Sequence, residues 1–260
     1  MDDIIMPLED FLPLTDECRH YTDESEVPPH LQKYWHQRYS LFTWYDYDIR
    51  LTDAAWFGVT PEPVANRIAE DLPAGDRDTI VDLFAGAGGN TIAFALSGKW
   101  NRVIAVERDP AVLACAQHNA DVYGVPDGAI TWVLADSLEY LARLKRSKKK
   151  KPVDVDRSLH LDFSRTLLFA SPPWGGVDYK DQEVFDLSTM QPYNLETLHE
   201  ACRPMEHALY LPRTSDLRQI ARLVPDGGPK LEVVQYCMRG ASKAMVVYVP
   251  AEGEVAGAGR

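Results

Sequence analysis

The chain has 260 residues, 45% of them hydrophobic and 25% charged, which suits one α/β domain with a modest extension and excludes a disordered chain. Its net charge of −12 argues against a protein that coats long nucleic acid through its overall field, but is compatible with a nucleotide end held by a few local cations. No apolar stretch approaches the ~20 residues of a membrane helix, and the acidic start MDDIIMP lacks the basic opening of a secretory signal, so we expect an intracellular protein without membrane contact.

The first part of the chain divides into an acidic lead-in and an aromatic segment. Residues 1–28 are acidic, rich in proline and turn-forming residues and show no sustained periodicity, so we expect them to be irregular or partly disordered. Residues 29–62 are dense in aromatic side chains, and Leu31, Tyr34, Trp35 and Arg38 lie at helical spacing, which predicts a short helix. Such a segment is interpreted either as packing on the main domain or as a lobe that contributes to a substrate site.

Residues 63–250 alternate strand and helix patterns and end in two strands. Apolar runs predict strands at residues 79–84, 102–107, 130–135, 166–171 and 207–211, and the intervening stretches predict helices at 89–96, 110–123, 137–145 and 215–223. Two last strands, 230–238 and 244–249, flank Arg239-Gly240 and predict an antiparallel hairpin. We therefore predict an α/β fold with a mostly parallel seven-stranded sheet, an antiparallel C-terminal hairpin and a small N-terminal helical extension. Residues 251–260 are expected to form a flexible tail.

A basic insertion at about residues 145–165 interrupts this alternation. Its run KRSKKKK, at residues 145–151, is open to three interpretations: a solvated loop, a nuclear import signal, or a contact to an RNA backbone.

The cysteines lie far apart and form no CxxC pair. Zinc ligation and a disulfide framework both need closer or paired spacing, so we expect no metal site and no disulfides. Reduced thiols are predicted, with Cys115 packed inside a helix; the full set is Cys18, Cys115, Cys202 and Cys237.

A glycine-rich loop, DLFAGAGGNT at residues 82–91, follows the first strand of the main domain and opens a helix. Gly86, Gly88 and Gly89 let the backbone approach a ligand closely with its amides facing it. The spacing is not the GxGxxG of a dinucleotide site, and the acid Asp82 opens the loop. A cationic ligand, such as the amino-acid end of S-adenosylmethionine, suits that acid.

Two further acids end the next two predicted strands. Glu107 stands where an acid would accept hydrogen bonds from ribose hydroxyls, and Asp136 could meet an adenine amino group. Because ligands of open α/β sheets bind at the carboxyl ends of the strands, three acids there predict an S-adenosylmethionine site. The predicted cofactor residues of the main domain are Asp82, Phe84, Ala85, Gly86, Gly88, Asn90, Thr91, Glu107, Arg108, Asp136, Ser137 and Ser171.

The most informative stretch is SPPWGG, at residues 171–176, which directly follows an apolar strand. Prolines donate no backbone hydrogen bonds and stiffen the turn, so its neighbourhood presents mainly acceptors, among them the Ser171 hydroxyl. An exocyclic amino group needs two acceptors, and the Trp174 ring can stack on the base that carries it. The stretch predicts methyl transfer to a nucleobase nitrogen; the alternative is a proline-rich turn whose tryptophan fills a surface hollow.

With these pieces in this order, the chain resembles the trimethylguanosine synthases over residues 33–249. The resemblance is carried by KYWHQRYSLF (33–42), WFGVTPE (56–62), VDLFAGAGGNTIAFAL (81–96), SPPWGGVDY (171–179) and YLPRTSD (210–216). It implies a Rossmann-like class I methyltransferase that consumes S-adenosylmethionine and releases S-adenosylhomocysteine. Its substrate would be the 7-methylguanosine cap of small nuclear and nucleolar RNAs, converted to the 2,2,7-trimethyl form.

The resemblance also implies residue roles. The cap base, cationic and therefore a stronger stacking partner, would lie on Trp174, and the cap phosphates would meet Lys33 and Arg213. Thr60 and Pro61 would border the methionine end of the cofactor. The implied catalytic set is Ser171, Pro172, Pro173 and Trp174, and the implied substrate-binding set is Lys33, Phe42, Trp174 and Arg213.

Some positions depart from the family pattern. Gly58 stands where serine is expected, which puts a polar contact near the methyl donor in doubt. Ala85 replaces a cysteine and Glu107 an aspartate, neither of which should alter the chemistry. Asp178 is a candidate proton acceptor close to the SPPWGG turn, with a structural role as its alternative.

The resemblance implies a nuclear protein, with presence in the nucleolus and some in the cytoplasm. It also implies capped RNA and ribonucleoprotein partners, and we expect a monomer. Two rival functions stay open: an amino-methyltransferase acting on a base of ribosomal RNA, transfer RNA or DNA, which would flip that base out, and a non-catalytic cap-binding protein.

Overall fold

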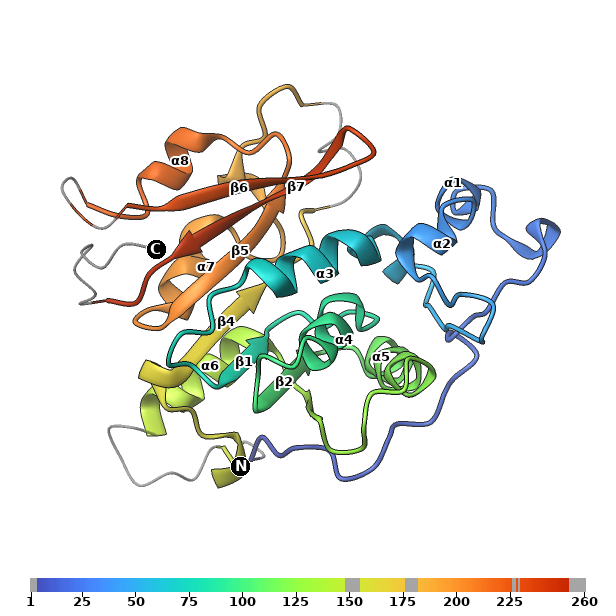
Figure 1. The fold of residues 1–260 in the computed structure, drawn as a ribbon, viewed down its shortest axis with the longest axis horizontal. Helices are drawn as coiled ribbons and strands as arrows, with labels where there is room; N and C mark the ends of the chain where they lie inside the picture. The colour runs from blue at the N-terminus through green and yellow to red at the C-terminus, as the bar shows by residue number, and fades with distance from the viewer. Residues whose placement is uncertain (1–3, 148–154, 176–181, 226–227, 229, 253–260) are drawn as a thin grey trace. The chain divides into compact units, whose positions relative to one another are not determined.

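A computed structural model describes residues 4–147, 155–175, 182–225, 228 and 230–252 (Figure 1). The chain forms two compact units, Met1–His160 and Leu161–Arg260. Residues 148–154, most of the basic insertion's lysine run, and Asp178 lie outside the described residues.

The first unit is built on three parallel strands in the order β3-β2-β1. These are β1 (Thr79–Asp82), β2 (Arg102–Glu107) and β3 (Ile130–Leu134). The middle of β2 is completely buried, as expected for a Val/Ile-rich parallel strand with both faces covered. The helices of this sheet are α4 (Gly89–Leu96), α5 (Pro110–Val122) and α6 (Ser137–Ser147), followed by a short 3-10 turn, η3 (Arg157–Leu159).

The segment before β1 is mostly irregular but well packed. Its helical pieces are η1 (Glu24–Glu26), α1 (Gln32–Trp35), α2 (Arg38–Leu41), η2 (Ala55–Phe57) and α3 (Glu62–Asp71). The Leu8 amide donates to the Trp132 carbonyl on β3 at 2.9 Å, and the Leu12 amide donates to Gln117 of α5 at 2.8 Å. The described lead-in is therefore tied to this sheet and to α5 by hydrogen bonds that its backbone amides donate.

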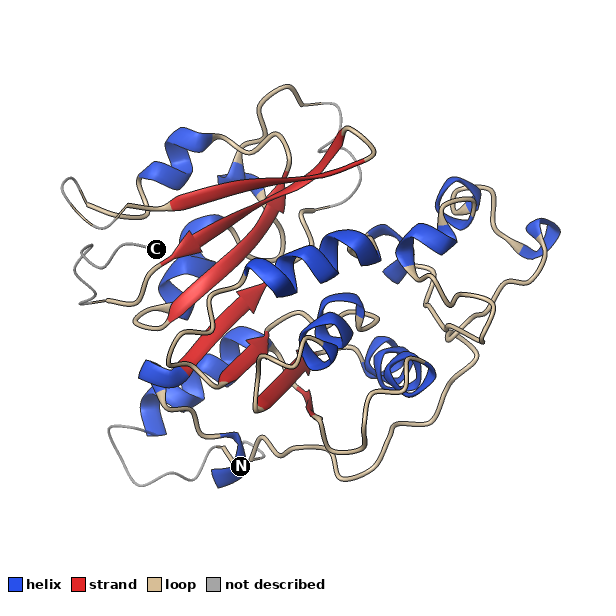
Figure 2. Ribbon diagram, in the orientation of Figure 1, coloured by secondary structure: helices blue, strands red, loops and turns tan. Residues whose placement is uncertain are grey.

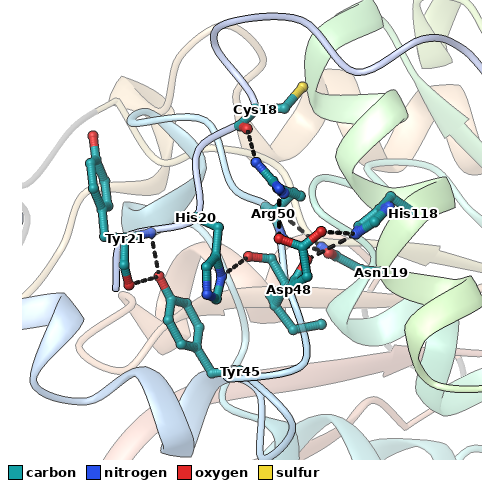
Figure 3. A network of polar contacts seen from close by, with 9 residues as sticks. Cys18, His20, Tyr21, Tyr45, Asp48, Arg50, His118 and Asn119 are labelled. Atoms are coloured by element: carbon teal, nitrogen blue, oxygen red, sulfur yellow. Dashed lines mark hydrogen bonds and ion pairs between the residues drawn. The ribbon is translucent and has the colours of Figure 1, made fainter. Parts of the chain in front are cut away.

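Residues 48–50 clamp this segment onto α5 (Figure 3). The Asp48 carboxylate pairs with Arg50 at 2.6 Å and with His118 at 3.3 Å. Asn119 accepts from the Arg50 amide at 2.8 Å and donates to the Arg50 carbonyl at 2.9 Å. One side-chain amide thus replaces a strand partner for the backbone of Arg50.

The second unit contains the other four strands. They are β4 (Thr166–Ala170), β5 (Glu206–Pro212), β6 (Glu232–Met238) and β7 (Ala241–Val249). β4 and β5 are parallel, and β7 pairs antiparallel with both β5 and β6. The β6–β7 hairpin turns at Arg239 and Gly240, as predicted, and both residues have positive φ. The helices of this unit are η4 (Phe163–Arg165), η6 (Leu187–Thr189), α7 (Leu195–Cys202) and α8 (Leu217–Ala221) (Figure 2).

The strand order is β3-β2-β1-β4-β5-β7-β6, which confirms the predicted seven-stranded, mostly parallel sheet with its antiparallel hairpin. The prediction lacked α3 and α7, and the one short helix expected through Arg38 is divided into α1 and α2. Among the described residues, no helix combines the length and apolar character needed to cross a membrane. All four cysteines are free thiols, as expected from their spacing, and Cys115 is buried in α5.

Candidate functional site

The acids singled out in the sequence gather at one edge of the first unit's sheet. Asp82 ends β1 and Glu107 ends β2, while Asp136 follows β3 by two residues. The three strands are parallel, so their carboxyl ends face the same edge. A backbone hydrogen bond joins two of these strand ends: the Ala135 amide donates to the Glu107 carbonyl at 3.0 Å.

Glu107 organises the glycine-rich loop. One carboxylate oxygen accepts from the Gly86 amide at 3.0 Å, and the other accepts from the amides of Arg108 and Asp109 at 2.8 and 3.0 Å. These bonds fix the carboxylate, and each oxygen has more than one lone-pair direction, so half-buried Glu107 retains acceptor capacity for a hydroxyl.

Asp82 is enclosed rather than open. Its side chain has no exposed surface, and it accepts from the Thr91 hydroxyl at 2.7 Å and from the Phe84 amide at 3.3 Å. Burial raises the pKa of Asp82 to about 7 against the lowering effect of those two hydrogen bonds; the nearby Glu107 charge adds to the rise. The buried hydrogen bond between Asp82 at the end of β1 and Thr91 of α4 therefore links the two ends of the glycine-rich loop.

The loop's glycines have backbone conformations that other residues avoid. Gly86 has φ +53° and Gly88 has φ +95°. A Cβ on Gly88 would lie 3.3 Å from the Cα and carbonyl oxygen of Ala116 in α5, so helix and loop approach each other closely here.

Asn90, in the first turn of α4, carries an unused buried acceptor. Its amide nitrogen donates to the Thr60 hydroxyl at 3.0 Å, whereas its Oδ1 is buried without a hydrogen-bond partner among the described residues. Buried polar atoms without partners are uncommon in proteins and call for a donor. Thr60 is buried and Pro61 half-buried, so the implied Thr60–Pro61 segment lies directly against the loop.

The remaining cofactor candidates fall into two groups. Asp136 accepts from the amides of Leu138 and Glu139, both at 3.0 Å, which begins α6, and stays half-buried. Ser137 is buried and donates to the Leu83 carbonyl, so it is part of the scaffold. Half-buried Phe84, buried Ala85 and exposed Arg108 complete the set.

These residues fit S-adenosylmethionine in their chemistry. The half-buried carboxylates of Glu107 and Asp136 suit ribose hydroxyls and an amino group. The glycine-rich loop lets a ligand approach its backbone amides closely, and the buried Asn90 Oδ1 has no hydrogen-bond donor among the described residues. Glu107 and Asp136 would hold the nucleoside, with the Asn90 Oδ1 available to an ammonium or hydroxyl donor. Among the described residues, no cluster of three or more His, Cys, Asp or Glu side chains could hold a metal ion.

The second unit presents the SPPW turn and Arg213 at the ends of neighbouring parallel strands. Residues 171–174 follow β4, and Arg213 follows β5 and is exposed. The Trp174 ring stacks on Tyr210 of β5, with centroids 5.7 Å apart and planes 19° apart, and its Nε1 donates to the Tyr210 carbonyl at 3.3 Å. The indole is half-buried and held on one face.

The other turn residues differ in exposure. Ser171 is half-buried, Pro172 is buried and Pro173 is exposed. Tyr210 was not among the predicted site residues, although it opens the YLPRTSD block; its position on a strand adjacent to that of the turn was the missing information.

The two implied substrate residues of the first unit have opposite surroundings. Lys33 is exposed on α1. Phe42 is only 2% exposed and packs its ring against Tyr123, the residue directly after α5, with centroids 6.1 Å apart. Phe42 thus lies in a packed environment, where its ring presents almost no surface to solvent.

Comparison with known proteins gives a consistent result. Residues 77–252 match the family model described as RNA cap guanine-N2 methyltransferase. The chain is 36% identical over 233 residues to the trimethylguanosine synthase of Schizosaccharomyces pombe, which covers 88% of this chain and 90% of that protein. It is 34% identical over 200 residues to the trimethylguanosine synthase of Saccharomyces cerevisiae, covering 74% of this chain and 58% of that protein.

Solved structures are similar at the level of the fold. A crystal structure from Porphyromonas gingivalis W83, described as a methyltransferase, aligns with a TM-score of 0.61 at 17% identity. The alignment covers 88% of this chain and 52% of that one. At this identity the likeness concerns architecture alone.

Proposed function

The chain belongs to the RNA cap guanine-N2 methyltransferase family, and on that premise we propose that it converts the 7-methylguanosine cap of small nuclear and nucleolar RNAs to the 2,2,7-trimethyl form. The enzyme class follows from the family, in which an RNA cap guanine receives a methyl group on N2. The choice of RNAs and the number of methyl groups are the proposed part.

The observation that carries the proposal is the placement of Trp174. Its ring is fixed by the Tyr210 stack and by one hydrogen bond, yet it keeps part of its surface open. A pre-oriented indole suits a planar cationic base, because stacking then costs little side-chain entropy and gains about 0.5–2 kcal/mol from the charge.

Further groups would complete the recognition. The Ser171 hydroxyl and the Pro172 carbonyl would accept the two hydrogens of the guanine 2-amino group. Exposed Arg213 and Lys33 would meet the cap phosphates, and these local cations offset a chain of net charge −12. Holding the amino nitrogen in place should supply much of the acceleration, since fixed reactants save roughly 7–11 kcal/mol.

The methyl donor of this family's fold class is S-adenosylmethionine, which supplies an activated methyl group when bound; S-adenosylhomocysteine would be the product. The glycine-rich loop, Glu107, Asp136 and Asn90 would bind it, supported from within by Asp82 and Thr91. Thr60, whose hydroxyl accepts from Asn90, and the adjacent Pro61 would border the bound cofactor.

The rival functions are less well supported. Methylation of an internal base of RNA or DNA, or cap binding without catalysis, does not agree with the family match over 77–252 and the two curated relatives. We further propose that the protein acts in the nucleus on capped small RNAs in ribonucleoprotein particles, as a monomer.

The direct test is incubation with 7-methylguanosine diphosphate and isotopically labelled S-adenosylmethionine, followed by mass analysis. We expect a product heavier by one or two methyl groups, with guanosine diphosphate as the control that stays unmodified. Equal labelling of guanosine diphosphate, or no labelling of the cap nucleotide, would reject the proposal.

A further inference from the structure

We propose that four side chains of the first unit, His30, Lys33, Tyr34 and Phe57, form a subsite for the first nucleotide that follows the cap, with its base on Phe57 and its phosphate at Lys33. We call these residues the α1 patch. The inference rests on the proposed function, because it assumes that capped RNA is the substrate.

The α1 patch lies at the start of a short helix. The Leu31 carbonyl accepts from the Tyr34 and Trp35 amides at 2.8 and 2.9 Å, and His30 directly precedes this N-cap residue. The His30 and Tyr34 rings both contact Phe57, and Lys33, next to Tyr34 on α1, is exposed. Two other residues of this turn belong to the core: Leu31 is 0% exposed and Trp35 is 8% exposed.

Phe57 packs onto that outer face and remains accessible. Its ring is stacked with His30 at 6.2 Å and 16° between planes, and meets Tyr34 edge-on at 5.0 Å. The side chain is nevertheless 43% exposed, while its neighbour Trp56 is 1% exposed. Phe57 is thus an oriented aromatic surface, the feature on which single-stranded bases stack in a sequence-tolerant way.

The α1 patch carries a cation that suits a phosphate. Lys33 is exposed on α1. Of the acids before the helix, Glu24 lies 3.2 Å from the His36 imidazole, and Glu26 accepts from the Thr22 amide at 3.0 Å. A cation and an exposed aromatic ring in one patch are complementary to a nucleotide, which carries both a phosphate and a base.

The patch lies close to the cofactor loop along the chain. Thr60, only three residues after Phe57, accepts a hydrogen bond from Asn90 at 3.0 Å. Three residues span at most about 11 Å. A nucleotide bridged to a guanine near that loop can therefore reach Phe57.

The test compares two cap ligands, 7-methylguanosine triphosphate and the dinucleotide that carries adenosine after the cap. For each ligand we would measure the dissociation constant from intrinsic tryptophan fluorescence, and kcat and KM for methyl transfer. The wild-type protein should bind the dinucleotide about fivefold or more tightly than the triphosphate, as expected for one base–aromatic stack. A dinucleotide with an abasic second ribose should lose that gain.

The variants assign the gain to the patch. F57A should abolish the preference for the dinucleotide while leaving the dissociation constant and kcat for the triphosphate unchanged; F57W should restore the preference. Tyr47→Ala is the matched control, because Tyr47 is 72% exposed and its ring contacts Trp44 rather than Phe57. Circular dichroism would verify folding of each variant.

Two results would overturn the subsite. One is no difference between the ligands in the wild-type protein, and the other is an F57A effect that is absent or equal for both ligands, which would point to a protein partner or a structural role. A failure of the proposed function is seen separately, as normal ligand binding with no methyl transfer, and the binding comparison then still decides the subsite.

Discussion

The pKa of Asp82 is set by the burial of its side chain. Burial lifts its pKa from 3.8 to about 7, so the folded protein keeps a proton that the unfolded chain releases. Between about pH 4 and 7 the native state binds more protons than the unfolded state, and the unfolding free energy must fall as the pH rises through that window.

The Asp82→Asn variant should remove this dependence. We expect the stability of D82N relative to wild type to rise between pH 4 and pH 7, by up to a few kcal/mol. Urea unfolding of both proteins at several pH values measures it. A constant difference across the range would mean that Asp82 titrates normally in the folded state.

Gly88 is required for a different reason. Its φ of +95° is strained for other residues, and a Cβ there would also press on Ala116 at 3.3 Å. Gly88→Ala should cost about 1–2 kcal/mol for the backbone conformation and about 1–3 kcal/mol for the contact. Gly98→Ala is the control: it has φ +67° with nothing within 4 Å, and should cost only the first part. Equal losses in thermal unfolding would show that the loop does not press on α5.

At the scale of elements, Glu62 joins three segments. One of its oxygens accepts from the Thr43 amide and from the Tyr123 hydroxyl, both at 2.6 Å, and so links the chain after α2 to the start of α3 and the end of α5. Burial, followed by the bond to Glu62, raises the pKa of Tyr123, so the phenol stays protonated as a donor. Trp44 stacks on the same tyrosine at 5.3 Å.

Tyr123→Phe should loosen this junction. We expect a loss of about 1–2 kcal/mol, because a charged acceptor is left with one donor fewer. Tyr39→Phe removes a similar bond, to Asp46, on an exposed side chain and should cost less. The two variants can be compared by denaturant unfolding; an equal cost for both would contradict a specific role of the Glu62 junction.

Local pattern predicted the regular elements of the sheet well. The predicted bounds of α4 and β2 agree with the structure, since turn residues and apolar runs mark both ends. α3 and α7 were missed even though the buried Val64 and Ile68, and Leu195 and Leu198, have helical spacing. Pro61 is the N-cap of α3 and Pro63 is its second residue; proline interrupts most helical patterns but is favoured in a first helical turn.

The candidate site was predicted only as a set of positions. Strand ends located Glu107 and Asp136, but side-chain direction is set by packing, which short motifs do not encode. The enclosure of Asp82 by Thr91 and the burial of Phe42 depend on such contacts. So does the Tyr210 ring under Trp174, which comes from a different strand.

At the scale of the whole molecule, the proposed cofactor residues, apart from Ser171, and the proposed base-stacking residue Trp174 belong to different units. The glycine loop, Glu107 and Asp136 lie in Met1–His160, while Trp174 lies in Leu161–Arg260. Each proposed function therefore has its own stabilising contacts. For cofactor binding these are the backbone amides that donate to Glu107, and for base stacking the Tyr210 ring that packs on Trp174.

Trp174→Ala should consequently separate the two tasks. We expect the rate of cap methylation to fall at least about a hundredfold, because the substrate base would no longer be held in a reactive orientation. The dissociation constant for S-adenosylmethionine should change less than about twofold, because the proposed cofactor residues around the glycine loop are untouched. Calorimetric titration with the cofactor and a methylation assay give both numbers. Weakened cofactor binding in this variant, or sustained turnover, would contradict the assigned stacking role.

Cys237 on β6 is the exposed member of four cysteines whose other three side chains are buried. A maleimide fluorophore should therefore attach at a single position of the unmodified protein, because enclosed thiols react slowly. Ligand titrations could then be followed by an optical signal from the hairpin, without engineering any residue.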